Sequence, residues 1–242
     1  MTTIEQNFEG QRVVITGGAG GIGSALARDI VRRGGGVVLV GRDARRLAAA
    51  AGEMGDAAEI AVCDVTDEAA VAAFFASQPP LDHLVTAAAG TTRGTVVELE
   101  VATARALFES KYWGQYMCAR YAIPLLKAGG SIVLFSGWVS RKPMAGASTL
   151  AAVDAAIEAL GRTLALEIAP RRANVVTPGA IDTPLWGARL TPGQQREHFA
   201  KVGQSLPVGR AGTAEDVAHA VRFLMENGFT TGAVVDVDGG QR

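Results

Sequence analysis

Short apolar runs alternate along the chain with longer segments in which apolar residues recur at helical spacing. Runs of four or five residues rich in valine, isoleucine and alanine predict β-strands at 12–16, 37–40, 59–63, 83–87, 131–135, 174–177 and 234–237. The segments between them predict helices at 24–33, 43–54, 68–76, 102–127, 147–168 and 215–225. The helix at 102–127 is expected to break or bend near Pro124.

Alternation of helices with strands that are apolar on both faces predicts an α/β protein with a mostly parallel sheet between two helical layers. No linker, repeat or low-complexity segment interrupts this pattern, so residues 1–242 are expected to form a single domain. One long irregular connection is expected between about Ala180 and Gly212. A connection of that length is typically a lid or binding loop, and a substrate lid is therefore expected near 184–212.

Composition narrows the class of protein. Hydrophobic residues make up 48% of the chain and glycine occurs 30 times, which is typical of an α/β enzyme rather than a disordered chain. A formal net charge of −1 provides no field that would recruit nucleic acid or an anionic membrane. The apolar runs are too short to span a bilayer, and the N-terminal segment lacks the apolar region of a signal peptide.

Cysteine and histidine add little further chemistry. Cys63 and Cys118 are far apart and form no C-x-x-C pair, so they are expected to be free thiols in a cytoplasmic protein. The three histidines show no metal-binding spacing. We therefore expect a small-molecule substrate and no metal site.

A glycine-rich segment at 16–23, with the sequence TGGAGGIG, joins the first predicted strand to the first predicted helix. Glycines let the backbone turn sharply and approach a pyrophosphate, while the helix start offers free N–H groups and the positive end of its dipole. Because the strand and helix flank it in the required order, this segment predicts dinucleotide binding. The alternative is a tight glycine turn without a ligand.

The spacing T-G-x-x-x-G-x-G resembles the fingerprint of the short-chain dehydrogenase/reductase family, and the resemblance covers nearly the whole chain. Asp64 and Val65 resemble the adenine-contacting pair of that family, and Thr183 resembles the residue that holds the nicotinamide carboxamide. The segments at 174–179, 210–218 and 231–240 are similar to its remaining signatures. The cofactor-binding residues implied by the resemblance are Gly17, Gly20, Gly21, Ile22, Gly23, Arg42, Asp64, Val65, Ala87, Pro178, Gly179, Ile181 and Thr183.

The resemblance also implies an overall arrangement. It implies a Rossmann-type, doubly wound sheet of seven strands in the order 3-2-1-4-5-6-7. It further implies that the helices at 102–127 and 147–168 form subunit contacts in a homodimer or homotetramer.

The end of the second predicted strand bears on cofactor choice. An acidic residue there suits the ribose hydroxyls of NAD, whereas a nearby arginine suits the 2′-phosphate of NADP. This chain has Gly41 at the acidic position, followed by Arg42 and Asp43. The sequence therefore favours NADP(H) over NAD(H). The alternative is that Arg42 is a solvated loop residue and that Asp43 only caps the next helix.

The catalytic residues of the family are largely replaced. The family carries Asn, Ser, Tyr and Lys, in which Tyr transfers the proton and Lys lowers its pKa. Here Leu150 stands at the Tyr position, Asp154 at the Lys position and Lys111 at the Asn position. Leucine cannot transfer a proton, and aspartate reverses the charge that would lower a tyrosine pKa. The Asn-Asn-Ala-Gly segment after the fourth strand is also absent, its place being taken by residues 86–90.

Ser136 stands at the Ser position, where it either orients a substrate oxygen or bonds the backbone of a strand-end turn. Two of the replacements are expected to compensate each other. We hypothesise that Lys111 and Asp154 form an ion pair and that Asp154 accepts a hydrogen bond from a ribose hydroxyl. Ser136, Lys111 and Asp154 are thus the candidate catalytic residues.

Two functions fit these observations. The first is an NADP(H)-dependent oxidoreductase with an atypical active site, acting on a carbonyl, enone, quinone or imine that needs little help from an acid. The second is a non-catalytic NADP(H)-binding sensor or partner subunit. The retained Ser136 and Thr183 and the long lid favour an enzyme, because a sensor needs no substrate pocket.

Overall fold

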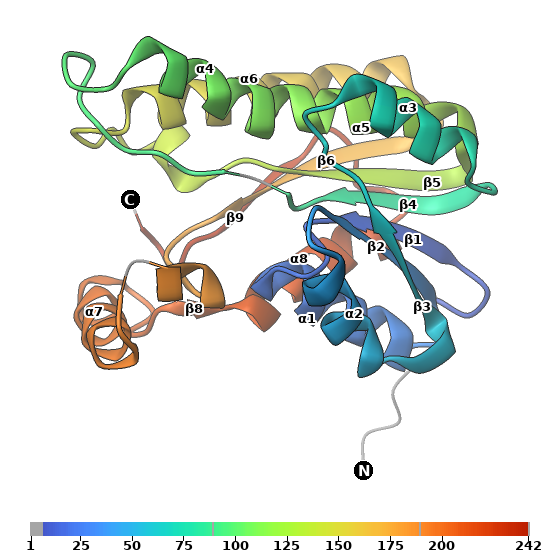
Figure 1. Cartoon of the computed structure of the whole chain (residues 1–242), viewed down its shortest axis with the longest axis horizontal. Helices are drawn as coiled ribbons and strands as arrows, with labels where there is room; N and C mark the ends of the chain where they lie inside the picture. The colour runs from blue at the N-terminus through green and yellow to red at the C-terminus, as the bar shows by residue number, and fades with distance from the viewer. Residues whose placement is uncertain (1–6, 89, 189, 242) are drawn as a thin grey trace.

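A central parallel sheet carries one layer of helices on each face (Figure 1). The computed structural model describes residues 7–88, 90–188 and 190–241. Seven parallel strands follow the order β3-β2-β1-β4-β5-β6-β9, which confirms the expected doubly wound topology. Their bounds are β1 Arg12–Thr16, β2 Gly36–Gly41, β3 Ala58–Val62, β4 Leu81–Thr86, β5 Leu126–Phe135, β6 Arg172–Pro178 and β9 Val234–Val237.

Helices α3 to α6 cover one face of the sheet, and α1, α2 and α8 cover the other (Figure 1). The bounds on the first face are α3 Glu68–Ala76, α4 Val101–Phe108, α5 Gly114–Ala122 and α6 Ser148–Glu167. Those on the second are α1 Gly21–Arg32, α2 Ala44–Gly52 and α8 Ala214–Glu226. A separate two-stranded sheet pairs β7 (Ile181–Asp182) with β8 (Gly212–Thr213).

The apolar strands supply two cores because successive side chains point to opposite faces. In β1, Val14 packs in the core beneath α3, α5 and α6, whereas Val13 and Ile15 pack in the core beneath α1 and α8. Ile132 and Val133 of β5 divide in the same way. Burial on both faces explains why the central strands are continuous apolar runs rather than alternating ones.

The segment 102–127 is bent, as predicted, but it does not end as a helix. Helix α4 passes into a π-helical turn at Glu109–Trp113, then into α5 and a 3₁₀ turn at Ile123–Leu125 that contains Pro124. Leu126 and Lys127 belong to β5, so the predicted helix was too long and the predicted strand too short. The apolar pattern missed this start because positions 127–130 of β5 read Lys-Ala-Gly-Gly.

The connection between Ala180 and Gly212 is not irregular, which corrects the prediction. It contains a helix of 14 residues, α7 (Pro192–Ser205), which begins with a capping box between Thr191 and Gln194. Within α7 only Phe199 and Gly203 are buried. A helix with so little apolar surface carries no periodic hydrophobic signal, although its cap and Pro192 are recognisable start signals.

The structure also bears on the two cysteines and on membrane-spanning helices. Cys63 and Cys118 are both free and buried. In the described part of the chain, no helix is both long and apolar enough to cross a bilayer.

Candidate functional site

The glycine-rich turn brings β1 close to the end of β4. Gly17 has a φ of +69°, and a Cβ there would lie 2.7 Å from the carbonyl carbon of Ala87. Ala87 in turn donates a hydrogen bond from its N–H to the carbonyl of Thr16 (3.1 Å). Only glycine fits this left-handed conformation and close approach, so the turn places two predicted cofactor residues side by side.

The start of α1 provides the expected anion-binding end. Its N-cap is Gly20, which has no side chain to satisfy the first N–H groups, and no acidic residue stands in the first turn. These N–H groups and the positive end of the helix dipole therefore suit a pyrophosphate. The turn and helix start fit a dinucleotide.

The ends of β2 and β3 carry the residues predicted for the other end of the cofactor site. Arg42 is exposed, and its Nη1 lies 4.0 Å from Oδ2 of Asp64. Asp64 Oδ1 accepts hydrogen bonds from the N–H and hydroxyl of Thr66, and the backbone bond lowers the pKa of Asp64. Val65 is partly buried against the core.

Asp43 caps α2, accepting hydrogen bonds from the N–H groups of Arg45 (3.0 Å) and Arg46 (3.1 Å). This confirms one half of the alternative raised for the segment after β2. The guanidinium of Arg46 also lies 3.4 Å from the carbonyl of Ala19 in the glycine-rich turn. Arg46 was not predicted, because it lies one helical turn beyond the usual motif, and it adds a second cation beside Arg42.

The predicted catalytic and nicotinamide-side residues line one pocket of about 220 Å³. It brings together residues from six separated segments of the chain. The lining residues are Ile22, Thr91, Arg93, Lys111, Ser136, Gly137, Trp138, Val139, Leu150, Asp154, Pro178, Gly179, Ile181, Thr183 and Trp186. Arg42, Asp64 and Val65 lie outside it, at the other end of the glycine-rich turn.

Lys111 and Asp154 form the hypothesised ion pair. Lys111 Nζ donates a hydrogen bond to Asp154 Oδ1, and both residues are buried. Burial raises the pKa of Asp154, and the ammonium of Lys111 opposes that shift. Asp154 Oδ2 is buried without a hydrogen-bond partner among the described residues. A ribose hydroxyl would bond Asp154 only if this oxygen were uncovered.

Gln115 supports the π-helical turn that carries Lys111. It is a buried residue of α5 that the sequence did not single out. The Gln115 amide donates hydrogen bonds to the carbonyls of Lys111 (2.8 Å) and Phe135 (2.9 Å). Its oxygen accepts from the N–H of Phe135 (2.8 Å) and the hydroxyl of Thr86 (2.6 Å). Gln115 therefore fixes the turn that carries Lys111 to the ends of β4 and β5.

Ser136 lines the pocket but directs its hydroxyl to α6. Ser136 Oγ donates to the carbonyl of Asp154 (2.9 Å) and lies 3.4 Å from Glu158 Oε1. The acceptor lies on the backbone of α6, whereas the structural alternative expected a bond within the strand-end turn itself. Leu150 stands buried on the pocket wall, with an apolar side chain where the family has its proton donor.

Glu158 forms a second buried charge cluster behind Ser136. Its Oε1 accepts from Ser140 Oγ (2.5 Å), and its Oε2 lies 3.1 Å from Arg162 and 3.4 Å from Arg141. The two arginines balance this carboxylate. Glu158 was not predicted, since a lone glutamate on a helix ordinarily reads as solvent-exposed.

The tetrad after β4 is only partly described, because Ala89 lies outside the described residues. Thr183 is buried beside the start of α1: a Cβ on Gly21 would lie 2.9 Å from Thr183 Cβ. Helix α7 is joined to the same segment, since Gln195 Nε2 bonds Asp182 Oδ1 (2.5 Å) and the Thr183 carbonyl (3.3 Å). Trp186 packs against His198 of α7, with ring centroids 5.0 Å apart.

A doubly wound sheet with a glycine-rich turn at the switch between β1 and β4 defines a dinucleotide-binding protein. Residues 17–242 match the model of the family described as enoyl-(acyl carrier protein) reductase. Cis-4-hydroxycyclohexanecarboxylate dehydrogenase of Sinomonas cyclohexanicum is 35% identical over 246 residues, covering 96% of this chain and 97% of the relative.

Two solved structures are similar over the whole fold. A short chain dehydrogenase/reductase family protein is 34% identical, with a TM-score of 0.87 over 97% of this chain and 98% of its own. A small-chain dehydrogenase in complex with NADPH is 33% identical, with a TM-score of 0.80 over 95% and 97% of the two chains. The chain belongs to the short-chain dehydrogenase/reductase family.

Proposed function

We propose that this protein is an NADP(H)-dependent oxidoreductase with an atypical active site, acting on a small carbonyl, enone, quinone or imine. The observation that carries the proposal is the single pocket in which Ile22 and Thr183 meet the Lys111–Asp154 pair. A bound nicotinamide would supply or accept hydride there. The Sinomonas relative, named as a dehydrogenase of a hydroxylated ring acid, supports an alcohol and carbonyl pair as substrate and product.

The choice of NADP(H) rests on charge at the ends of β2 and α2. Gly41 provides no carboxylate for a ribose hydroxyl, and the Asp43 carboxylate is held by the helix cap. Arg42 and Arg46 are available for a 2′-phosphate, for which guanidinium groups are well suited. The relative solved with NADPH supports the same assignment.

Lys111 is the group on the pocket wall that holds a transferable proton. Its ammonium has three donors, one of which bonds Asp154 Oδ1. The remaining donors are available to a substrate oxygen or nitrogen. Asp154 acts through Lys111, because its carboxylate bonds the buried ammonium and fixes its position, and it is a positioning residue in this proposal. In this proposal Ser136 holds α6 against the end of β5 through its bond to the carbonyl of Asp154 and makes no direct bond to the substrate.

An active site without the tyrosine acid favours substrates that tolerate developing negative charge or already carry positive charge. General acids typically contribute 10²- to 10⁴-fold to such reactions. Quinones and enones spread the added charge over conjugated atoms, and iminium ions need no acid. These classes are therefore expected to react faster than simple ketones.

The testing experiment measures binding and turnover separately. NADPH and NADH are titrated by calorimetry, and oxidation of the reduced nicotinamide is followed by absorbance with ketones, quinones, enones and cyclic imines. Tight NADPH binding with turnover of one class, reduced about 10²-fold in Lys111→Met, is the expected result. Failure to bind either nucleotide would overturn the proposal.

A second candidate function is favoured by Leu150, which cannot transfer a proton, and by the Ser136 hydroxyl, which is bonded to the carbonyl of Asp154 on α6. Both observations suit a non-catalytic NADP(H)-binding sensor or partner subunit. Tight NADPH binding without turnover of any class would favour this function over the first.

We further propose that residues 184–212 act as the substrate lid, because α7 is hydrogen-bonded to the nicotinamide-side segment through Gln195. Loss of those bonds in Gln195→Ala is expected to raise the KM for substrate while the NADPH affinity changes less. A KM equal to that of the unaltered protein would remove the lid from the proposal.

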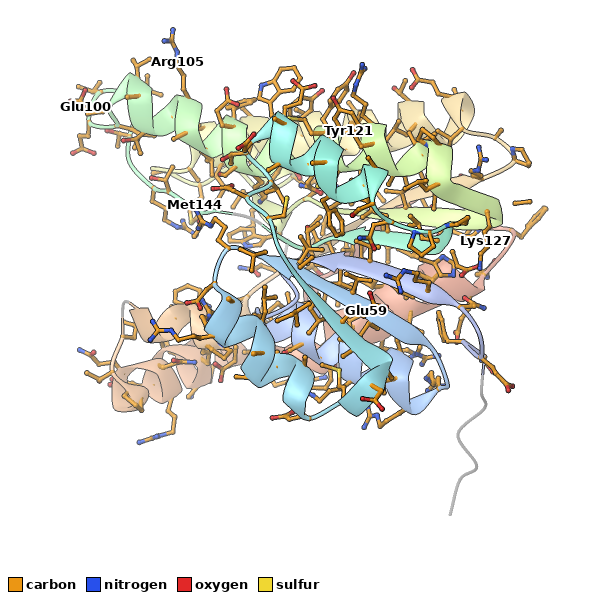
Figure 2. All side chains as sticks on the ribbon, turned by 45° about the vertical axis from the view of Figure 1, so that its right-hand side comes forward. Glu59, Glu100, Arg105, Tyr121, Lys127 and Met144 are labelled. Carbon is orange, nitrogen blue, oxygen red and sulfur yellow. The ribbon has the colours of Figure 1, made fainter. Side chains whose placement is uncertain are left out.

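Helices α4 and α6 border an open apolar groove of about 670 Å³, which supports the homodimer or homotetramer expected from the family resemblance. Val96 and Val101 on its rim are 78% and 66% exposed, and Trp113 is 42% exposed. Figure 2 shows Arg105 projecting from α4 at this outer surface. Trp113→Glu is expected to shift the sedimentation of the protein towards the monomer.

A further inference from the structure

The pocket carries one charge that the proposed chemistry does not use. Three of its lining residues are charged: Arg93, Lys111 and Asp154. Lys111 and Asp154 neutralise each other within the buried ion pair. Arg93 therefore leaves the lining with a net positive charge.

Arg93 is exposed and lacks an acidic partner among the described residues. Its Nη1 lies 3.2 Å from the thioether sulfur of Met144, which is a weak acceptor and carries no charge (Figure 2 labels Met144). Glu98, five residues away, uses its carboxylate to bond the hydroxyl of Thr95 (2.7 Å). The guanidinium is consequently available to an anion that enters the pocket.

Two other arginines, Arg141 and Arg162, do have carboxylate partners. Arg141 pairs with Glu158 and with Asp236, and Arg162 pairs with Glu158. Acidic groups are thus common around this end of the sheet. Arg93 therefore differs from Arg141 and Arg162 in having no carboxylate partner among the described residues.

The rest of the lining describes the body of the ligand. Trp138 and Trp186 bring aromatic surfaces to the pocket, and the Trp186 indole N–H is already bonded to the carbonyl of Ile181 (3.1 Å). Leu150 and Val139 add aliphatic surface. At about 220 Å³ the pocket is smaller than typical ligand sites, so its ligand is small and largely apolar.

We propose that the substrate is a small, largely apolar compound that carries a carboxylate, and that Arg93 binds this carboxylate. The inference rests on the proposed oxidoreductase function and adds the substrate class to it. A guanidinium matches a carboxylate in geometry and charge, so Arg93 determines specificity while Lys111 serves the reacting atom.

The first test measures binding without turnover. Benzoate, cyclohexanecarboxylate and benzamide are titrated by calorimetry into the protein saturated with NADP⁺. At least one carboxylate is expected to bind tenfold or more tightly than the uncharged benzamide. Equal affinity for benzamide and both carboxylates, or no binding of either carboxylate, would overturn the inference.

Variants assign the binding to Arg93. Arg93→Met is expected to weaken carboxylate binding by about 10- to 150-fold, the range of a hydrogen bond to a charged group. Arg93→Lys is expected to retain part of the affinity. Lys142→Met, which removes an exposed cation outside the pocket lining, is the matched control and is expected to bind like the unaltered protein. Unchanged carboxylate affinity in Arg93→Met would contradict the inference.

A second test uses turnover and separates the two proposals. 4-Acetylbenzoate and 4-acetylbenzamide differ only in the charged group, and kcat/KM is compared for both. A preference for the carboxylate that disappears in Arg93→Met supports the inference. Turnover without such a preference leaves the oxidoreductase standing and removes the role of Arg93. Carboxylate binding that depends on Arg93, with no turnover here or of any ketone, quinone, enone or imine in the panel above, supports the anion site and removes the reductase.

Discussion

Gly137 lies so close to Asp154 that a Cβ at position 137 would come within 2.6 Å of the Oδ2 atom. Gly137 follows the end of β5, and Asp154 lies on α6, so the contact joins the sheet to the helix beside the pocket. The missing side chain at position 137 leaves the room that the buried carboxylate occupies.

Gly137→Ala is therefore expected to displace Asp154 and disturb its pairing with Lys111. Overpacking of this kind typically costs about 1–3 kcal/mol. The free energy of unfolding, measured in urea, checks this expectation. Gly52→Ala is the control, because a Cβ at position 52 meets no atom within 4 Å. Equal stability of the two variants would show that the carboxylate adapts without cost.

Removal of one partner from the Lys111–Asp154 pair should cost more than removal of both. A single variant, Lys111→Met or Asp154→Leu, leaves an unpaired buried charge and is expected to lose about 3–5 kcal/mol of stability. The double variant replaces the pair with apolar groups and is expected to recover much of that loss. A double-mutant cycle in urea measures the coupling. Additive losses would contradict a direct interaction between the two charges.

Restoring the residue types of the family at the active site is expected to restore part of the chemistry of the family. The triple variant Lys111→Asn, Leu150→Tyr, Asp154→Lys restores the residue types of the family. A tyrosine acid is expected to accelerate reduction of simple ketones by about 10²- to 10⁴-fold. The same background with Leu150→Phe supplies the ring without the hydroxyl and controls for packing. Equal rates in the two triple variants would show that position 150 does not deliver the proton.

Cofactor preference should depend on the cations beside the glycine-rich turn. Arg42→Ala and Arg46→Ala are each expected to weaken NADPH binding by about tenfold or more and to leave NADH binding nearly unchanged. Gly41→Asp should reverse the preference, since a Cβ at position 41 meets only ordinary contacts with Leu47 at 3.5 Å. Calorimetric titration with both nucleotides provides the measurement. A parallel loss for NADPH and NADH would contradict a 2′-phosphate contact.

His83 makes stability depend on pH below neutrality. Burial lowers the pKa of His83 to about 4, and its Nδ1 and Nε2 bond Ser131 Oγ (2.8 Å) and Gln11 Oε1 (2.9 Å). Between pH 6.5 and 4 the unfolded chain binds more protons at this site than the folded protein. Its contribution to stability is therefore complete above about pH 6.5 and falls by about 3 kcal/mol towards pH 4.

Denaturation in urea across this pH range checks the slope. His83→Gln should flatten it, whereas His219→Gln, at an exposed position, should retain it. A slope that persists in His83→Gln would assign the pH dependence to other groups.

The strands of the sheet were predictable because a strand buried on both faces is a nearly continuous apolar run, as 37–40 and 132–135 are. The strand order came from the family resemblance, since periodicity alone does not say which strands are neighbours. Helix α7 escaped prediction because its contacts with the rest of the protein involve few apolar residues. The start of β5 escaped it because Lys127, Gly129 and Gly130 separate the buried Leu126, which pairs with Leu81 of β4, from the apolar run of the strand.

Within the site, the ion pair between Lys111 and Asp154 was predictable because one change adds a positive charge and the other replaces a positive charge with a negative one. The family places these two positions near each other. The direction of the Ser136 hydroxyl was not predictable, because it depends on which acceptor of α6 lies within reach. The same limit applies to Arg46 and Glu158. Their roles follow from where a helical turn points in space, which motif spacing does not record.

The contact between Gly21 and Thr183 has a consequence for the order of ligand binding. It joins the first turn of α1 to the segment that Gln195 connects to α7. Under the proposed function the nucleotide and the substrate would both contact this stretch of backbone, so the binding of either ligand would favour the binding of the other. Cooperativity of this kind is reciprocal. The factor by which a substrate tightens cofactor binding must equal the factor by which the cofactor tightens substrate binding.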